Sequence, residues 1–281
     1  MGGREGEWAG AANHNGEPMS TSVRPMGRVN WIGLWTHYCK EVQRFWKVAF
    51  QTLVAPMVTT LLFLAVFTLA LGRAVETVKD VPFEVFLAPG LIVFAIIQNS
   101  FANTSSSMLI LKIQGSIVDL LMPPLTPGEL VLGFIAGSVT RGLIVGVLVG
   151  SVMWLFTDLQ IVNPWIVIFH MVAASMMLSL AGLITAIWAD KYDNVASITN
   201  FIITPLSFLS GTFYSIDRLP AFWHTIAQFN PFFYMIDGFR SGFIGTSDAP
   251  VWTGIVVVTS LNVMLWVICH RMFARGWKLK D

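Results

Sequence analysis

Hydrophobic residues are gathered into six long runs, and shorter, more polar segments connect them. Each run has about 20 residues or more, which is enough for a helix to cross the hydrocarbon core of a bilayer. Because lipid offers the backbone no hydrogen-bond partner, each run is predicted to be an α-helix. The runs are Val48–Leu71, Val85–Met108, Leu130–Phe156, Trp165–Trp188, Val195–Phe213 and Val251–Phe273. The pattern predicts an all-α membrane protein with six transmembrane helices.

The composition and the distribution of charge support this prediction. Hydrophobic residues make up 55% of the chain and charged residues 12%, whereas soluble domains carry about 25% charged residues. Of the 17 Lys and Arg, twelve lie on one predicted side of the membrane, four on the other, and Arg141 lies within a run. By the positive-inside rule, both termini are predicted to be cytoplasmic. Membrane lipid is an expected partner, and the net charge of +1 gives no indication of nucleic-acid binding.

The residues before the first run divide into two parts. Residues 1–29 are polar and rich in glycine, and we expect a disordered cytoplasmic arm. From Asn30 to Lys47, apolar residues such as Ile32, Trp35 and Phe45 recur at steps of three and four. This spacing is typical of an amphipathic helix in the inner membrane interface. The alternative is a cytosolic helix packed on a partner.

The second half of the second run is unusually polar. Gln98, Asn99 and Asn103 stand there among several Ser and Thr, and a helix facing lipid would leave such groups without partners. Arg141 is the only Lys, Arg, Asp or Glu deep within any run, and a charge at mid-bilayer costs about 2.5–3.5 kcal/mol. These four residues predict a substrate path or a helix interface. Arg141 either pairs with polar groups of the second run or contacts an anionic group of a substrate.

The segment between the second and third runs predicts a short cytoplasmic amphipathic helix. Ile117, Leu120 and Leu121 share one helical face, and Pro123 and Pro124 end the helix. Such a helix should dock onto the membrane surface or onto a partner protein.

The segment Tyr214–Gly245 is too apolar for a solvated loop and too interrupted for a transmembrane helix. Asn230 followed by Pro231 is typical of a helix start. We therefore predict two short helices that dip into the outer leaflet as a re-entrant hairpin and act as an external gate. Aromatic residues should enter the leaflet, while Arg240 should lie in the water above, paired with Asp237 or with substrate headgroups. The gate residues are Phe222, Trp223, Phe229, Phe233, Tyr234 and Arg240.

Motifs for catalysis and for metal binding are missing. No GxxxxGK[ST] phosphate loop and no metal-ligand spacing of Cys and His is found. Cys39 and Cys269 fall on the predicted cytoplasmic side, where a disulfide is not expected. The chain is therefore not predicted to be an enzyme.

A proton-driven secondary transporter is the alternative function, and it would need a titrating residue such as His170 within a run. A membrane-embedded enzyme would need a catalytic cluster.

Four segments of the chain resemble the ABC-2 type permeases, the membrane subunits of bacterial ABC exporters. They are LAPGLIVFAIIQNSFANTSSSMLILKIQGSIVDLLMPP, VTRGLIVGVLVG, SLAGLITAIWADKYDN and TPLSFLSGTFYSIDRLPAFWHTIAQFNPFFYMIDGFRSGF. The resemblance covers nearly the whole chain. It is closest to the subgroup that includes nodulation-factor exporters, whose ATPase is a separate chain.

The resemblance implies a homodimer in the bacterial inner membrane, with residues 30–281 forming the transmembrane domain. Two ABC ATPase subunits would bind ATP and Mg, and this chain would bind no cofactor. The substrate would be amphipathic or lipid-linked, such as a glycolipid, a lipid or a hydrophobic drug. The resemblance also assigns ATPase coupling to the segment between the second and third runs, through Lys112, Gln114, Ser116, Ile117, Asp119, Leu120 and Leu121.

Overall fold

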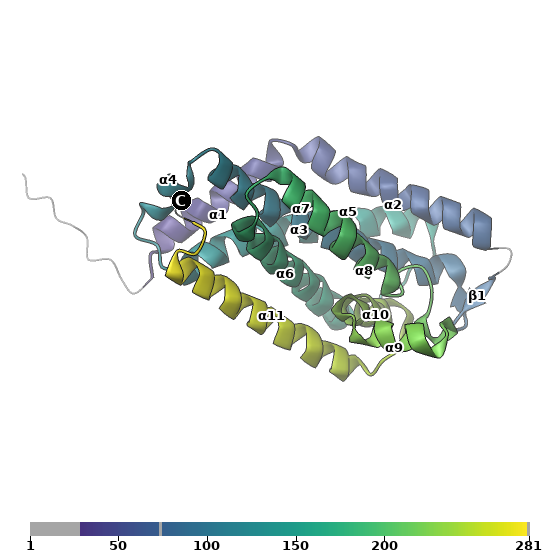
Figure 1. Cartoon of the computed structure of the whole chain (residues 1–281). Coiled ribbons are helices and arrows are strands. Elements are labelled where there is room, and N and C mark those ends of the chain that lie inside the picture. The colour runs from purple at the N-terminus through teal and green to yellow at the C-terminus, as the bar shows by residue number, and fades with distance from the viewer. Residues whose placement is uncertain (1–28, 73–74, 280–281) are drawn as a thin grey trace, which may run out of the picture.

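The computed structural model describes residues 29–72 and 75–279, so nearly all of the predicted arm at residues 1–29 lies outside the described residues. The described chain is an elongated bundle of helices (Figure 1). Five helices are long and apolar enough to cross a membrane. They are α2 (Ala49–Leu71), α3 (Phe83–Ile113), α5 (Pro127–Phe156), α6 (Pro164–Trp188) and α11 (Val251–Arg275). Five of the six predicted runs are thus confirmed as long helices.

The remaining run, Val195–Phe213, is not one long α-helix. α7 (Tyr192–Ile198), a π-helical turn (Thr199–Ile203) and α8 (Thr204–Leu209) take its place and follow one another directly. Pro205 gives the physical reason, because it has no N–H to donate to the carbonyl four residues earlier, and a lost bond of this kind favours an irregular turn. The sixth span remains a prediction.

α3 is the central helix of the bundle. In its most apolar 18-residue window 83% of the residues are buried, compared with 11% for α2. Four serines, which we call the serine contact, join α3 to α5 and α6. The hydroxyls of Ser100 and Ser175 lie 2.7 Å apart, Ser138 Oγ donates to Ser100 O (2.9 Å), and Ser179 Oγ lies 2.6 Å from Ser138 Oγ. Gly142 permits this approach, since a Cβ there would lie 2.3 Å from Ser175 Oγ.

α1 (Trp31–Trp46) packs along the first half of α5. Asn30 caps it by accepting a hydrogen bond from Gly33 N (3.0 Å). The face turned to the chain is not the predicted apolar stripe, because it mixes Leu34 and Phe45 with two polar side chains, His37 and Glu41. Ile32 and Trp35 stay 76% and 65% exposed, and this exposed apolar surface is what an interfacial helix turns toward lipid.

The two ends of the bundle are differently built. α4 (Ile117–Leu121), α1 and the last turn of α11 lie at one end, which we call the α4 end (Figure 1). The opposite, β1 end carries the two-stranded sheet of β1 (Thr77–Val78) and β2 (Val81–Pro82), a 3-10 turn (Ile216–Arg218), α9 (Ala221–Phe229) and α10 (Pro231–Ile244). The two short helices predicted between Tyr214 and Gly245 are therefore confirmed. Their position relative to the membrane stays a prediction.

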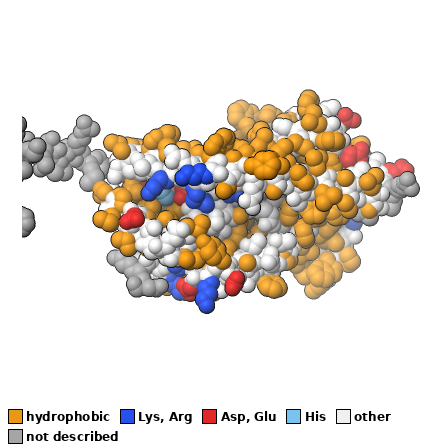
Figure 2. All heavy atoms as spheres, turned by 90° about the horizontal axis from the view of Figure 1, so that it is seen from above, with side chains coloured by type: hydrophobic (Ala, Val, Ile, Leu, Met, Phe, Trp, Pro, Cys, Tyr) orange, Lys and Arg blue, Asp and Glu red, His pale blue; other side chains and the backbone are white. Residues whose placement is uncertain are grey.

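Hydrophobic side chains cover most of the surface seen in Figure 2, and Lys and Arg gather mainly in the half that carries α4. α1 and the end of α11 lie at this same end, as expected if both termini are on one side of a membrane. A basic end favours the cytoplasmic side.

The topology can be tested by cysteine labelling in spheroplasts, in a chain whose Cys39 and Cys269 are replaced by alanine. Thr246→Cys lies at the β1 end and Gln114→Cys at the α4 end, and both native side chains are exposed. We expect a membrane-impermeant maleimide to label Thr246→Cys in intact spheroplasts and Gln114→Cys only after lysis. The opposite pattern would show that the orientation is reversed.

Candidate functional site

α1 carries a charged pair into the bundle near the α4 end. The Glu41 carboxylate accepts a hydrogen bond from Ser107 Oγ of α3 (2.7 Å) and lies 3.3 Å from Arg44 NH2. Gly137 of α5 makes room for α1, since a Cβ there would lie 2.5 Å from the Cβ of Glu41. Burial raises the pKa of the Glu41 carboxyl, and the nearby Arg44 guanidinium offsets only part of that effect. The ion pair therefore stabilises both charges at a position where Glu41 is shielded from water.

Two arginines from different helices meet at one amide oxygen. Arg44 NH2 donates to Asn103 Oδ1 (2.8 Å), and Arg141 NH1 of α5 donates to the same oxygen (3.3 Å). Arg141 NH2 also donates to Asn99 Oδ1 (2.9 Å). Within residues 29–72 and 75–279, Arg141 has no carboxylate at ion-pairing distance. Glu41 is thus the one carboxylate paired with these two guanidinium groups, and the cluster keeps a net positive charge.

Arg141 lies midway along α5 and level with the end of α1, and its depth in the membrane stays a prediction. Arg141 shares the Asn103 oxygen with Arg44, and Arg44 stands five residues before the start of α2. Arg141 therefore lies at the depth where α1 ends and the apolar helix α2 begins. The contacts with Asn99 and Asn103 agree with the predicted pairing to the second run.

These groups border a groove of about 600 Å³ between α1, α2, α3 and α5, which we call the arginine groove. The four residues predicted as a path or an interface are brought together here, because Gln98, Asn99 and Arg141 line the groove and Asn103 holds both arginines. Apolar walls accompany the polar groups. The lining comprises Arg44, Phe45, Val48, Gln51, Thr52, Ala55, Pro56, Thr59, Thr60, Phe94, Ala95, Gln98, Asn99, Ala102, Ser106 and Arg141. A cationic centre within a partly apolar wall suits an amphipathic molecule with an acidic group.

Arg240 of the predicted external gate is a buried structural residue. It is 2% exposed, and its guanidinium lies 3.9 Å from the ring centroid of Phe86. Its Nε donates to the Phe86 carbonyl (3.2 Å), and its NH2 donates to the carbonyls of Gly211 (2.7 Å) and Thr212 (3.3 Å). The predicted position in water is wrong. The carbonyls of Gly211 and Thr212 lie in the bend after α8, and the Arg240 guanidinium supplies their donor inside the protein.

Asp237 does not form an ion pair with Arg240, contrary to the alternative considered from the sequence. It accepts hydrogen bonds from the backbone N–H groups of Asp248 (2.8 Å) and Ala249 (3.0 Å). Asp248 in turn pairs with Lys79 and accepts a hydrogen bond from Ser215 Oγ (3.0 Å). Burial raises the pKa of Asp248, but Lys79 and Ser215 together hold it below its usual value. These contacts close the loop after α10.

The predicted gate aromatics divide between the two short helices. Phe222, Trp223 and Phe229 of α9 are 69%, 47% and 85% exposed, which agrees with side chains that contact a leaflet. Phe233 of α10 is 1% exposed, and Tyr234 is half-buried. A role for Phe233 as a wedge in the leaflet is therefore wrong, since it packs in a small cluster at the β1 end.

The predicted coupling segment is helical over a shorter range than expected. Lys112 belongs to α3, and its ammonium donates to the carbonyls of Ile187 (2.8 Å) and Ala189 (2.7 Å) at the end of α6. Gln114 ends α3, and Gly115, with φ of +71°, turns the chain before Ser116. Lys112 therefore supports the neighbouring helix instead of pointing away from the chain.

α4 itself presents a small surface at the α4 end. Ile117 is buried, and Leu120 and Leu121 are half-buried against the chain. Val118 and Asp119 are exposed, as is Met122, which follows the helix. The apolar face predicted for docking thus holds α4 in place, and the opposite face is open to a partner.

Residues 33–244 match the family model of the ABC-2 type transporters. The chain belongs to this family. It is 35% identical to the inner membrane transport permease YadH of Escherichia coli (strain K12) over 257 residues, which are 91% of this chain and 100% of YadH. It is 24% identical to Nodulation protein J of Rhizobium leguminosarum bv. viciae, over 92% of this chain and 98% of that protein. The resemblance stated from the sequence is confirmed.

Membership makes the chain an ABC transporter permease. Members of the ABC-2 family are membrane subunits that generally work with an ABC ATPase and are not themselves enzymes. The arginine groove and the α4 surface are thus the parts of a transport subunit that merit functional analysis.

Sequence reasoning missed Glu41 and Arg44 as site residues. Both lie off the apolar positions of the predicted interfacial helix, where a solvated side chain is the ordinary expectation. A signal was present, because Glu and Arg three residues apart on a helix form a pair, and Asn103 needed a partner.

Replacing Arg240 tests the buried role at the β1 end. Arg240→Met should lower stability by about 1–3 kcal/mol for each carbonyl left without a donor. A melting measurement in detergent checks this. Arg218→Met is the matched control, because Arg218 is exposed and makes one long bond to Thr77 O (3.3 Å). Equal melting of both variants would contradict the role.

Replacing Asn103 tests the shared oxygen. Asn103→Leu should destabilise the chain by about 1–3 kcal/mol, because two half-buried guanidinium groups lose an acceptor. Asn103→Asp should melt at or above the parent, since a carboxylate between two arginines forms stronger, charge-assisted bonds. The reverse order of stability would show that the two arginines do not depend on this atom.

Proposed function

We propose that the chain is the permease subunit of an ATP-driven exporter of an amphipathic or lipid-linked substrate. Two copies and two separate ABC ATPase subunits form the transporter, and ATP and Mg bind to the ATPase. The membrane is the bacterial inner membrane, and both termini are cytoplasmic. The name of YadH, an inner membrane transport permease, supports the membrane assignment. Glycolipids, lipids and hydrophobic drugs are the substrate classes considered.

The observation that carries the proposal is the identity of residue 103. Its Nδ2 has no hydrogen-bond partner among the described residues, while its Oδ1 accepts from two arginines. Aspartate at this position would remove the unpaired donor and neutralise one guanidinium. Asparagine instead holds the arginines in place and leaves the cluster its net positive charge, as required of a site that takes up an anion. The substrate is therefore one with an acidic headgroup.

The α4 surface is the proposed contact with the ATPase. Asp119 and Val118 are exposed, and α4 is fixed to the bundle through Ile117. Lys112 ties α3 to the end of α6 beside it. Force applied to α4 would thus reach the two helices that form the serine contact with α5.

The alternative, a proton-driven secondary transporter, would need His170 to exchange protons with water. The ring is fully buried, and its Nδ1 lies 2.9 Å from the carbonyl of Ile166. Its Nε2 points at Gly238, where a Cβ would lie only 2.0 Å away. This packing favours a structural role for His170.

Association with an ATPase is tested by purifying the tagged chain from the membranes of its own cells. The parent preparation should hydrolyse ATP and contain a second protein with a GxxxxGK[ST] motif. Asp119→Lys should lower the ATPase activity and the amount of this second protein by about tenfold, a loss of ~1.4 kcal/mol in binding. The reason is that the charge of an exposed contact is reversed. Asp193→Lys, also exposed but on α7, is the control. Full recovery of ATPase with Asp119→Lys would contradict docking through α4.

Substrate charge is tested on the purified complex in nanodiscs with a matched pair of probes. Hexadecyl phosphate should stimulate ATP hydrolysis, and the uncharged hexadecanol should not. Asn103→Asp should remove the stimulation while the protein stays folded and melts at or above the parent. Stimulation that survives in Asn103→Asp would exclude the groove as the anion site.

A further inference from the structure

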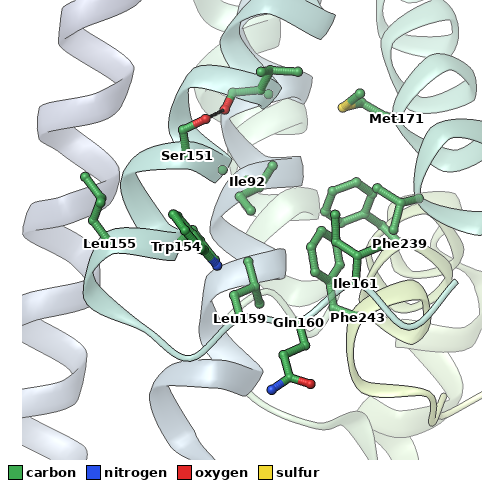
Figure 3. A pocket seen from close by; sticks show the side chains of 14 residues that line it. Ile92, Ser151, Trp154, Leu155, Leu159, Gln160, Ile161, Met171, Phe239 and Phe243 are labelled. Carbon is green, nitrogen blue, oxygen red and sulfur yellow. Dashed lines mark hydrogen bonds between the residues drawn. The ribbon is translucent and has the colours of Figure 1, made fainter. Parts of the chain in front are cut away.

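A second cavity lies in the half of the bundle toward the β1 end. It has a volume of about 880 Å³ and is bounded by α3, α5, α6, α10 and the segment between α5 and α6. Its walls are almost wholly apolar, and no Lys, Arg, Asp, Glu or His is among the residues that line it. Figure 3 shows Phe239 and Phe243 of α10 on one side and Trp154 of α5 on the other. The cavity shares no lining residue with the arginine groove, which lies toward the α4 end.

A glycine creates part of this space. A Cβ on Gly150 would meet only Ile92 Cδ1, at 3.6 Å, which is an ordinary contact distance. Gly146, one turn earlier, has no such room, since its Cβ would lie 2.8 Å from Ile96 Cδ1. Gly146 therefore serves helix packing, whereas Gly150 borders open space. A larger side chain at position 150 would extend into the cavity.

The mouth of the cavity opens on the apolar surface of the bundle. Trp154 and Ile161 at the mouth are 65% and 59% exposed, whereas Phe239 and Phe243 at the floor are 1% and 8% exposed. The polar groups present are the Gln160 amide and the hydroxyl of Ser151, and the latter already donates to Val147 O (2.8 Å). An occupant must therefore be an apolar chain whose polar end stays near Gln160.

We propose that this cavity holds one acyl chain of a membrane phospholipid from the leaflet at the β1 end. Water is a poor occupant, because it needs two to four polar partners and the walls offer almost none. An empty space of this size would cost packing energy, while hydrocarbon surrounds the mouth. A flexible chain can reach Phe239 and Phe243, whereas the broad face of a helix from a second copy cannot. The inference does not depend on which substrate is exported.

Photolabelling of the full-length chain in nanodiscs tests the proposal. The probe is phosphatidylcholine with a diazirine near the end of one acyl chain, and mass spectrometry locates the label. We expect label on Phe239, Phe243 and Ile92, because these residues line the cavity. Gly150→Phe should lower label at these three residues about tenfold, because the ring fills the space. Leu132→Phe, a substitution at an exposed site of the same helix, should change nothing.

Ser151→Trp is a second variant, and it blocks the mouth from an exposed position. It keeps the test informative if Gly150→Phe fails to fold. It should lower the same labels by a similar factor while melting like the parent. Absence of label at Phe239 and Phe243 in the parent would overturn the proposal. Label that is unchanged in both blocking variants would overturn it too, as would cross-links showing that a second copy covers Trp154.

Discussion

The close approach of α3 to α5 and α6 is the constraint on which the rest of the structure depends. A backbone in hydrocarbon makes its own hydrogen bonds, so polar side chains within the bundle must find partners on neighbouring helices. Ser100, Ser138, Ser175 and Ser179 do so, and Gly142 brings the backbones near enough. This contact places the arginine groove and the apolar cavity at different heights along α3.

Basic side chains serve two different purposes in this chain. Arg240 at the β1 end and Lys112 near the α4 end each donate to carbonyl groups at places where helices end. Their charge is spread over backbone dipoles, so they act as structural caps. Arg44 and Arg141 instead share a neutral amide, and the carboxylate of Glu41 pairs with Arg44. Their charge is the part of the interior that remains available to a ligand.

The sequence predicted those features that depend on local pattern. Runs of apolar residues gave five long helices, Asn230 and Pro231 gave the start of α10, and the polar half of α3 correctly predicted inward contacts. Features that depend on packing were not predictable in this way. The interior position of Arg240 results from carbonyls supplied by α3 and by the bend after α8, which are far apart in the chain.

The same limit applies to irregular helical turns. In the fifth run, a single proline is enough to break a pattern of hydropathy that otherwise fits one helix. Hydropathy measures the environment of a segment and not its hydrogen bonding.

The position of Arg44 has a thermodynamic consequence for the whole transporter. Arg44 belongs to α1, yet the atoms that hold it belong to α3 and to Glu41. An anion that engages this guanidinium competes with those atoms, and so changes the free energy that keeps α1 against the bundle. By linkage, anything that shifts α1 must change the affinity for the anion by the same factor. Under the proposed function, the position of α1 would therefore report whether the groove is occupied, and a displacement of α1 would release the anion.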